Sequence, residues 1–232
     1  MTTVTHKSIR PIVLIYYPLL MTVDGRLARG DRARSAALDA AVVLATEVGL
    51  EGLSLARLAD TLGVSKSGLF AHWRSKETLQ LATVDRAAEQ WQERIVGPGL
   101  HAPAGVRRLW ALHQARIDFY AAQVLPGGCF FASTDFEYNA RPGPVRDRLA
   151  EVFARWTAFL ERLVREAVDA GELPAGTDVP LLAYEIDALG IAAAMRSRLV
   201  DPDAAYRHAR QGLLNRLRAL CPDPTLLPEG LS

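Results

Sequence analysis

Small and basic side chains are concentrated in residues 63–76, and their spacing suits contact with DNA. At about 100° per residue, one side of a helix in this stretch carries Leu69 and Trp73, which we expect to pack inward. The other side carries Lys66, Ser67, Phe70, Ala71 and Arg74. Such a face can enter a major groove about 12 Å wide, where a Ser hydroxyl pairs with base edges and an Ala methyl touches a thymine methyl. Residues 61–76 contain no acidic side chain, which favours a polyanionic partner.

Helix caps on both sides of Gly63 position this face. Ser54 precedes an apolar stripe with i, i+3, i+4, i+7 spacing and is a candidate N-cap, whereas Gly63 follows the stripe, where a left-handed residue ends a helix. The stripe consists of Leu55, Leu58, Ala59 and Leu62. Ser65 opens a second helix of about two and a half turns that reaches Arg74. This arrangement predicts a helix-turn-helix, the alternative being a short amphipathic surface helix in an all-α protein.

A third cap is predicted at Ser75. Glu77 lies in the first turn of the helix that this cap opens, and Lys76 lies beside amides whose dipole favours an anion. We therefore expect a DNA phosphate to bind at Lys76. Upstream, residues 31–48 are rich in Ala and are followed by Gly49, which predicts a helix that braces the other two.

Together these caps and faces resemble the signature of the tetracycline-repressor (TetR) family of one-component bacterial transcription regulators. The matching residues are Gly63-Val64-Ser65, Leu69-Phe70-Ala71-His72-Trp73, Ser75-Lys76-Glu77 and Leu79. The resemblance implies an N-terminal three-helix DNA-binding domain, a larger helical domain for ligand binding and dimerisation, and repression that a small molecule relieves. The family usually has Tyr in place of Phe70, so a phosphate bond through a phenol hydroxyl is absent here. Trp73 replaces a common Phe in the same packing role.

Position within the family implies DNA contacts at Ser54, Lys66, Ser67, Phe70, His72 and Lys76. Spacing and charge add Arg29, Arg32, Ser65, Gly68 and Ala71 to the candidates. A Gly inside a helix costs about 1 kcal/mol relative to Ala, so Gly68 suggests close approach either to DNA or to the helix that begins at Leu55. The arginines before residue 35 form either a minor-groove arm or a solvated, unordered arm. A net charge of +1 argues against a protein that coats DNA without specificity.

The remaining chain predicts helices separated by loops, and the expected fold is all-α with about nine helices. We expect an extension over residues 1–24, a helix-turn-helix DNA-binding domain over 25–80, a ligand-binding and dimerisation domain over 81–221, and a tail over 222–232. Helices are predicted over residues 75–96, 104–123, 128–139, 144–170, 179–199 and 202–220, with a candidate hinge at Gly97-Pro98-Gly99.

Residues 9–21 are too short and too interrupted by proline to span a bilayer, so no membrane partner is expected. Either Met21 is the initiator or residues 1–20 form a disordered or partly helical extension, the alternative being a functional arm.

Aromatic side chains are concentrated in the second domain, where a concave apolar site with a few polar groups would hold a small molecule. The candidate ligand contacts are Trp91, Trp110, His113, Phe130, Phe131, Asp135, Trp156 and Tyr184. For each ring, ordinary core packing is the alternative. Residues 127–131 and 141–146 resemble a C-terminal type found in the same family, which supports the domain without naming an effector.

The last two predicted helices have the composition of a dimer interface. Residues 181–194 are apolar over more than one face, and such a helix must be buried by something. The candidate interface residues are Leu182, Ile186, Leu189, Ala193, Leu213 and Leu217. In the family, these helices form a four-helix interface across a two-fold axis. Packing within one subunit is the alternative.

Other functional classes lack their motifs. The chain has no His-Glu-x-x-His, no phosphate-binding Gly-Lys-Ser/Thr loop, no dinucleotide Gly pattern and no Gly-x-Ser-x-Gly, so we do not expect an enzyme. Two cysteines suggest neither a disulfide framework nor a zinc site, so no metal or cofactor is expected and a reducing cytoplasm fits. Cys129 is either a buried apolar residue or a redox or ligand-site thiol.

Together with these motifs, the resemblance to the TetR family implies a ligand-responsive repressor. We expect it to bind a palindromic DNA operator as a homodimer and to be released by a small apolar or aromatic effector. A ligand-independent or activating DNA-binding regulator is the alternative.

Overall fold

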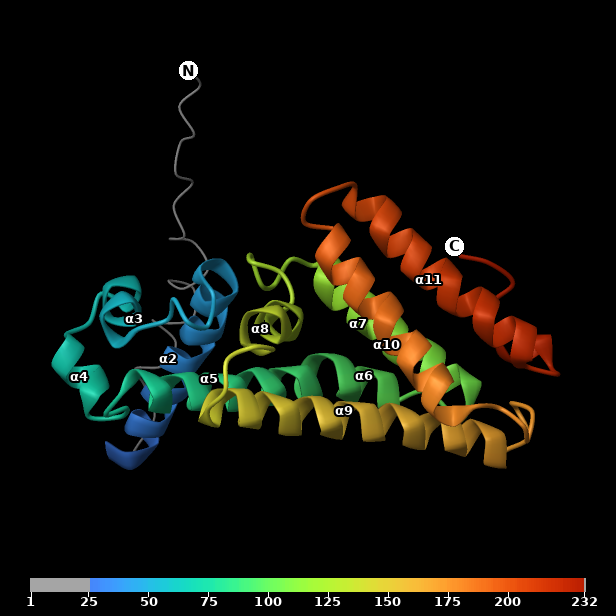
Figure 1. The fold of residues 1–232 in the computed structure, drawn as a ribbon, viewed down its shortest axis with the longest axis horizontal. Coiled ribbons are helices and arrows are strands. Elements are labelled where there is room, and N and C mark those ends of the chain that lie inside the picture. The colour runs from blue at the N-terminus through green and yellow to red at the C-terminus, as the bar shows by residue number, and fades with distance from the viewer. Residues whose placement is uncertain (1–25, 232) are drawn as a thin grey trace, which may run out of the picture.

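A computed structural model describes residues 26–231, with side chains from residue 30, and this part of the chain is helical without any strand (Figure 1). The helices are α2 (Arg26–Val48), α3 (Leu55–Leu62), α4 (Lys66–Phe70), α5 (Lys76–Trp91), α6 (Gly97–Leu100), α7 (Val106–Ala121), α8 (Phe130–Tyr138), α9 (Pro144–Asp169), α10 (Val179–Arg196) and α11 (Pro202–Leu220). The predicted all-α fold is thus confirmed. The predicted extension over residues 1–24 lies outside the described residues.

The three predicted helix caps are confirmed. Ser54 and Ser65 each accept a hydrogen bond from the backbone N–H three residues ahead, at 3.2 and 3.3 Å. Gly63 ends α3 in the left-handed region, with φ at 65°. At the start of α5, Ser75 and Thr78 form a capping box in which each side chain accepts from the other's amide. These caps set where each helix of the DNA-binding unit begins.

The recognition helix is shorter than predicted. α4 ends at Phe70, and the next two residues form a turn instead of continuing the helix to Arg74. Trp73 is only 2% exposed, as its predicted inward packing requires. The amides of His72 and Trp73 both donate to the carbonyl of Leu69, at 2.9 and 3.0 Å, so the backbone turns at this point before Ser75 caps α5.

α5, a π-helical turn (Gln92–Val96) and α6 form one rod that runs along α9 (Figure 1). Gly97, Pro98 and Gly99 are helical, so the helix predicted to end at residue 96 continues through the candidate hinge. Pro98 has no N–H to donate to the preceding turn, and the wide π turn before it accommodates this loss. A Cβ on Gly99 would lie 2.7 Å from the Cα of Leu112, so the rod packs tightly on α7. The predicted domain boundary after residue 80 falls within this rod.

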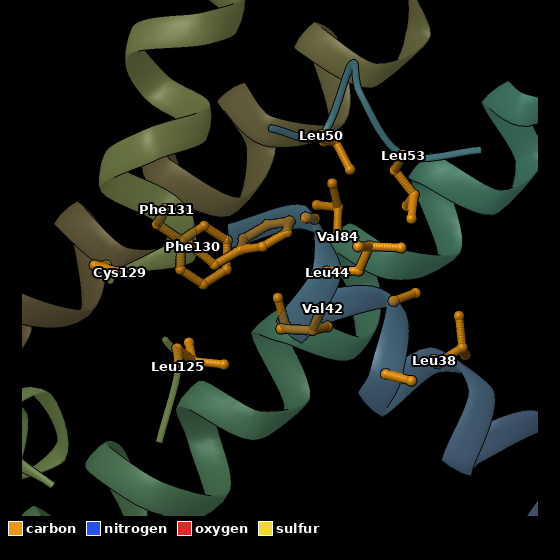
Figure 2. Packing of buried hydrophobic residues seen from close by; sticks show 14 of the residues in the cluster. Leu38, Val42, Leu44, Leu50, Leu53, Val84, Leu125, Cys129, Phe130 and Phe131 are labelled. Atoms are coloured by element: carbon orange, nitrogen blue, oxygen red, sulfur yellow. The ribbon is translucent and has the colours of Figure 1, made fainter. Parts of the chain in front are cut away.

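Two apolar cores hold the helices together. The first joins helices α2, α3, α4 and α5 to α8 and the segment before it, and Figure 2 shows Phe130 beside Val42 of α2. The second core lies between the C-terminal end of the rod and the four helices α7, α9, α10 and α11. The predicted DNA-binding helices therefore share a core with α8.

Most predicted dimer contacts are buried inside the subunit. Leu182, Ile186, Ala193, Leu213 and Leu217 are between 0% and 2% exposed and pack α10 and α11 onto their neighbours. Because these five side chains are fully used within one subunit, they cannot form a surface between two, and their assignment is corrected. Leu189 is half-buried. The large apolar side chains left exposed on or just after α10 are Leu181, Tyr184, Met195, Leu199 and Val200.

Candidate DNA-binding face and effector cavity

α4 and the turn after it present an exposed surface at one end of the molecule (Figure 1). The predicted contacts that lie exposed together there are Lys66, Ser67, Gly68, Phe70, Ala71 and His72. Lys66 Nζ lies 5.5 Å from the centroid of the Phe70 ring, which is 42% exposed. The surface thus joins a cation, small side chains and an exposed ring on one short element.

The serines at the helix caps are already engaged. Ser54 and Ser65 use their hydroxyl oxygens to cap α3 and α4, and Ser67 donates to Ser65 at 3.2 Å. An added Cβ on Gly68 would meet only the Ser65 hydroxyl, at an ordinary 3.4 Å. Close packing against α3 therefore does not require a glycine at this position.

Lys76 already has a partner on the protein. Its Nζ lies 2.5 Å from Glu51 Oε1, and Glu51 Oε2 accepts a hydrogen bond from the Tyr138 hydroxyl at 3.1 Å. The Lys76 hydrogen bond, against the opposing effect of burial, holds the pKa of Glu51 below its usual range. A phosphate bound by Lys76 must compete with or share this ion pair. Of the arginine candidates, Arg32 is half-buried, and the side chain of Arg29 lies outside the described residues.

A cavity of about 610 Å³ opens among α5, α7, α8, α9 and α10. Four of the predicted ligand contacts line it: Trp91, Phe131, Asp135 and Trp156. Trp91 meets Phe131 and Trp156 edge to face, with ring centroids 5.6 and 5.4 Å apart. The cavity has the size and the aromatic walls that suit a small organic ligand.

The other four predicted contacts do not line this cavity. Trp110 lies on a separate, shallow groove, Phe130 is in the first core, and Tyr184 is 72% exposed. His113 is 1% exposed, and its Nε2 lies 3.1 Å from the carbonyl of Ala209. Burial, together with the charge of Arg116, lowers its pKa to about 3. His113 is therefore a neutral core residue.

The cavity wall also holds a charged pair that was not predicted from the sequence, Arg116 and Asp187. Arg116 is 4% exposed, and its Nε donates to the Tyr120 hydroxyl while Nη1 donates to Asp187 Oδ1, both at 2.8 Å. Trp156 Nε1 donates to the same carboxylate oxygen at 2.8 Å. The guanidinium carbon lies 5.2 and 5.7 Å from the ring centroids of Trp91 and Trp156. The cavity wall thus holds a cation among aromatic rings.

Gly190 is the one residue whose type could have indicated this pair from the sequence. Arg116 and Asp187 are 71 residues apart in sequence, so no short motif connects them. Gly190, in the interior of α10, is unfavourable for a helix, and an added Cβ there would overlap the Arg116 guanidinium. Gly190 therefore provides the space that Arg116 occupies.

α8 connects the cavity to the DNA-binding helices. Glu137 accepts hydrogen bonds from the amides of Leu50 and Glu51, at 2.8 and 2.9 Å, just before α3. Gln80 Nε2 donates to the carbonyl of Leu50 and to the hydroxyl of Tyr138, at 2.8 and 3.0 Å. Bonds from amides to an ionised carboxylate are among the stronger hydrogen bonds in proteins. The end of α8 therefore fixes the loop between α2 and α3.

Within residues 30–231, no cluster of three or more His, Cys, Asp or Glu side chains could hold a metal ion. In the same range no helix is both long and apolar enough to cross a membrane. Both cysteines are buried thiols, and Cys129 also contributes to the cavity wall.

The fold and the exposed α4 surface define a helix-turn-helix DNA-binding transcription regulator. Residues 37–83 match bacterial regulatory proteins of the tetR family, and residues 105–213 match the tetracyclin repressor-like C-terminal domain. The chain belongs to the TetR family, and the resemblance found in the sequence is confirmed.

Individual relatives agree with this assignment. The chain is 27% identical over 151 residues to the HTH-type transcriptional repressor ComR of Escherichia coli K12, covering 65% of this chain and 72% of ComR. A TetR transcriptional regulator from Chloroflexus aurantiacus superimposes with a TM-score of 0.77 at 25% identity, over 83% of this chain and 98% of that one. AibR, solved with isovaleryl coenzyme A and operator DNA, has the same fold, with a TM-score of 0.62 at 20% identity over 81% and 97% of the two chains.

Proposed function

We propose that this protein is a ligand-responsive repressor, and not an enzyme, that binds a palindromic operator as a homodimer. A small apolar or aromatic molecule in the cavity releases it from DNA. The observation that best supports the proposal is the position of α8. Phe131 on this helix lines the cavity, and Glu137 on the same helix accepts hydrogen bonds from the loop before α3. The ligand and operator bound to AibR, and the repressor name of ComR, support the same function. Binding to the chromosome implies a cytoplasmic protein.

The proposed signal passes through contacts that are already in place. A ligand against Phe131 displaces α8, and Glu137 moves with it. The loop that Glu137 holds leads directly into α3, and Glu51 in this loop is bound to Lys76 at the start of α5. A shift of α8 therefore reorients the recognition helix relative to the rod. The ligand acts because it favours a state that fits DNA poorly.

The proposed dimer uses the exposed side of α10. Two recognition helices related by a two-fold axis read half-sites about one helical turn, roughly 34 Å, or a multiple apart. Leu181, Tyr184 and Met195 are between 47% and 72% exposed on α10. Exposed apolar side chains gathered on one element are typical of surfaces that bind a partner. We assign this face to the second subunit.

Footprinting on the DNA beside the protein's own gene tests the DNA-binding part of the proposal. At fixed salt we expect protection of an inverted repeat, with random DNA of equal length bound about 10³-fold more weakly or worse. Equal retention on random DNA would contradict sequence-specific regulation.

The effector part is tested with a panel of small apolar and aromatic molecules and a fluorescent operator. A molecule that releases the wild-type protein but not Ala132→Trp, whose indole would occupy the cavity, supports the proposal. Ala132 lines the cavity and is half-buried, so a larger side chain there reduces the available volume. If release is equal in both proteins, the cavity is not the effector site.

A further inference from the structure

The ion pair in the cavity wall keeps one donor and one acceptor available. Arg116 uses Nε and Nη1, and Asp187 uses Oδ1, in the bonds described above. Within the described part of the chain, Arg116 Nη2 donates to no acceptor and Asp187 Oδ2 accepts from no donor. The two side chains are 5% and 28% exposed, and both line the cavity. A hydrogen-bond donor and an acceptor therefore lie on paired groups at the same place.

The surroundings hold this pair in a single arrangement. Gly190 leaves the space for the guanidinium, Tyr120 fixes Nε, and the indoles of Trp91 and Trp156 lie within 5.7 Å of its carbon. A buried ion pair adds little net stability, because desolvation of the two charges offsets their attraction. A packed apolar pair would join α7 to α10 equally well. A ligand that binds to both charges would explain why a charged pair is present here in place of an apolar one.

Other charged groups in the cavity wall are either paired or hydrated. Arg148 binds Asp85 at 2.7 Å, and Glu89 binds Arg86 at 2.9 Å. The two remaining side chains, Asp135 and Arg155, are exposed to water, which screens their charge. The buried part of the cavity thus has balanced charge, and a charged ligand group there would lie next to one charge of its own sign.

We infer, on the basis of the proposed effector site, that the effector is an uncharged aromatic carboxamide or lactam. Its carbonyl accepts from Arg116 Nη2, and its N–H donates to Asp187 Oδ2. A carboxylate in this place lies against the Asp187 carboxylate, and an ammonium lies against the guanidinium. The rings of Trp91, Phe131 and Phe153 enclose the apolar body, and about 610 Å³ is enough for two fused rings.

Three probes with the same ring system test this inference: naphthalene-2-carboxamide, naphthalene-2-carboxylate and 2-naphthylmethylammonium. Isothermal titration of the full chain at neutral pH gives their dissociation constants. We expect the carboxamide to bind about tenfold more tightly than either charged probe, because only the carboxamide satisfies both free atoms. Equal or tighter binding of a charged probe overturns the inference, and so does the absence of binding by all three at millimolar concentration.

A charge-removing variant checks the assignment to the pair. Asp187→Asn leaves the guanidinium without its counter-charge, so the order should reverse and the carboxylate should bind more tightly than the carboxamide. Asp169→Asn, on the exposed end of α9, is the matched control and should keep the wild-type order. If circular dichroism shows that Asp187→Asn is unfolded, the three probes on the wild-type protein decide alone.

The result of the probe-binding experiment can be distinguished from the result that tests the proposed function. A carboxylate that binds most tightly and also releases the operator overturns the carboxamide class and leaves the ligand-responsive regulator standing. An absent footprint overturns the regulator whatever the order of the three probes.

Discussion

The ion pair between Lys76 and Glu51 lies between the candidate DNA-binding face and α8. The pair is partly exposed, with side chains 41% and 44% accessible, so it adds little to stability on its own. Its position matters more, because Glu51 is also bonded to Tyr138 of α8. The same carboxylate thus contacts a candidate phosphate-binding residue and the helix that lines the cavity.

The first prediction concerns Lys76→Ala. If Lys76 binds a phosphate, the variant should weaken binding to operator and random DNA by similar factors and should lower the slope of log affinity against log salt by about one. Fluorescence anisotropy over a salt series measures both. Arg162→Ala, an exposed change on α9, is the control. An unchanged slope in Lys76→Ala would remove this residue from the interface.

The second prediction concerns pH and His113. Its pKa falls from 6.5 to about 3 on folding, so between these values the unfolded chain binds a proton that the native protein does not. The free energy of unfolding is therefore highest above about pH 6.5. It decreases progressively, by a few kcal/mol, as the pH falls toward 3. Urea denaturation between pH 4 and about 7 measures this loss.

The matched variants identify the residue responsible. His113→Gln removes the titrating ring and should flatten the pH dependence in this range. His208→Gln, at an exposed position on α11, should retain it. The same slope in both variants would show that other groups cause the acid sensitivity.

Helices proved easier to predict than the contacts between them. The caps at Ser54, Ser65 and Ser75 could be predicted from the sequence, because a capping side chain accepts a hydrogen bond from an amide only three residues away. The early end of α4 could not be predicted, since the helical pattern continues to Arg74 and residues 71–74 contain neither Gly nor Pro to end a helix.

The candidate site shows the same difference between local and distant information. Trp91 and Trp156 were predicted from composition, yet their contacts with Arg116 and Asp187 depend on how four helices, α5, α7, α9 and α10, pack together. Apolar spacing on α10 and α11 correctly marked buried faces. It could not tell burial within a subunit from burial between two subunits, because both require the same pattern.

The third prediction tests α8 as the connecting element. Glu137→Gln replaces a carboxylate that accepts from two amides, so we expect a loss of about 1–3 kcal/mol in unfolding free energy. Hydrogen exchange at Leu50 and Glu51 should become faster than in the wild-type protein. Glu161→Gln, which weakens an i,i+4 pair with Arg165 on α9, should change the stability by less than about 0.5 kcal/mol. Unchanged exchange at both amides would show that Glu137 does not hold this loop.

In the described part of the molecule, the helix-turn-helix end and the end that holds the cavity are joined by a continuous rod and a shared core (Figure 1). Because no break separates α5 from α6, motion of the rod carries the start of α5 with it. Affinity for a two-fold operator then depends on how a partner subunit sets the distance between two such ends.

The fourth prediction addresses that partner. Tyr184→Asp places a charge on the exposed face of α10, so we expect monomers in sedimentation, an unchanged helical spectrum and loss of operator binding. Ala158→Asp, on the exposed side of α9, should remain dimeric. A Tyr184→Asp protein that stays dimeric would move the interface away from this face.

We propose above all that two copies of the chain act together on one operator. Sedimentation of the wild-type protein with its footprinted inverted repeat, at micromolar concentration, measures the stoichiometry directly. Our account predicts two subunits on each palindromic site and no stable complex with an isolated half-site. A single subunit that protects the full site would contradict it.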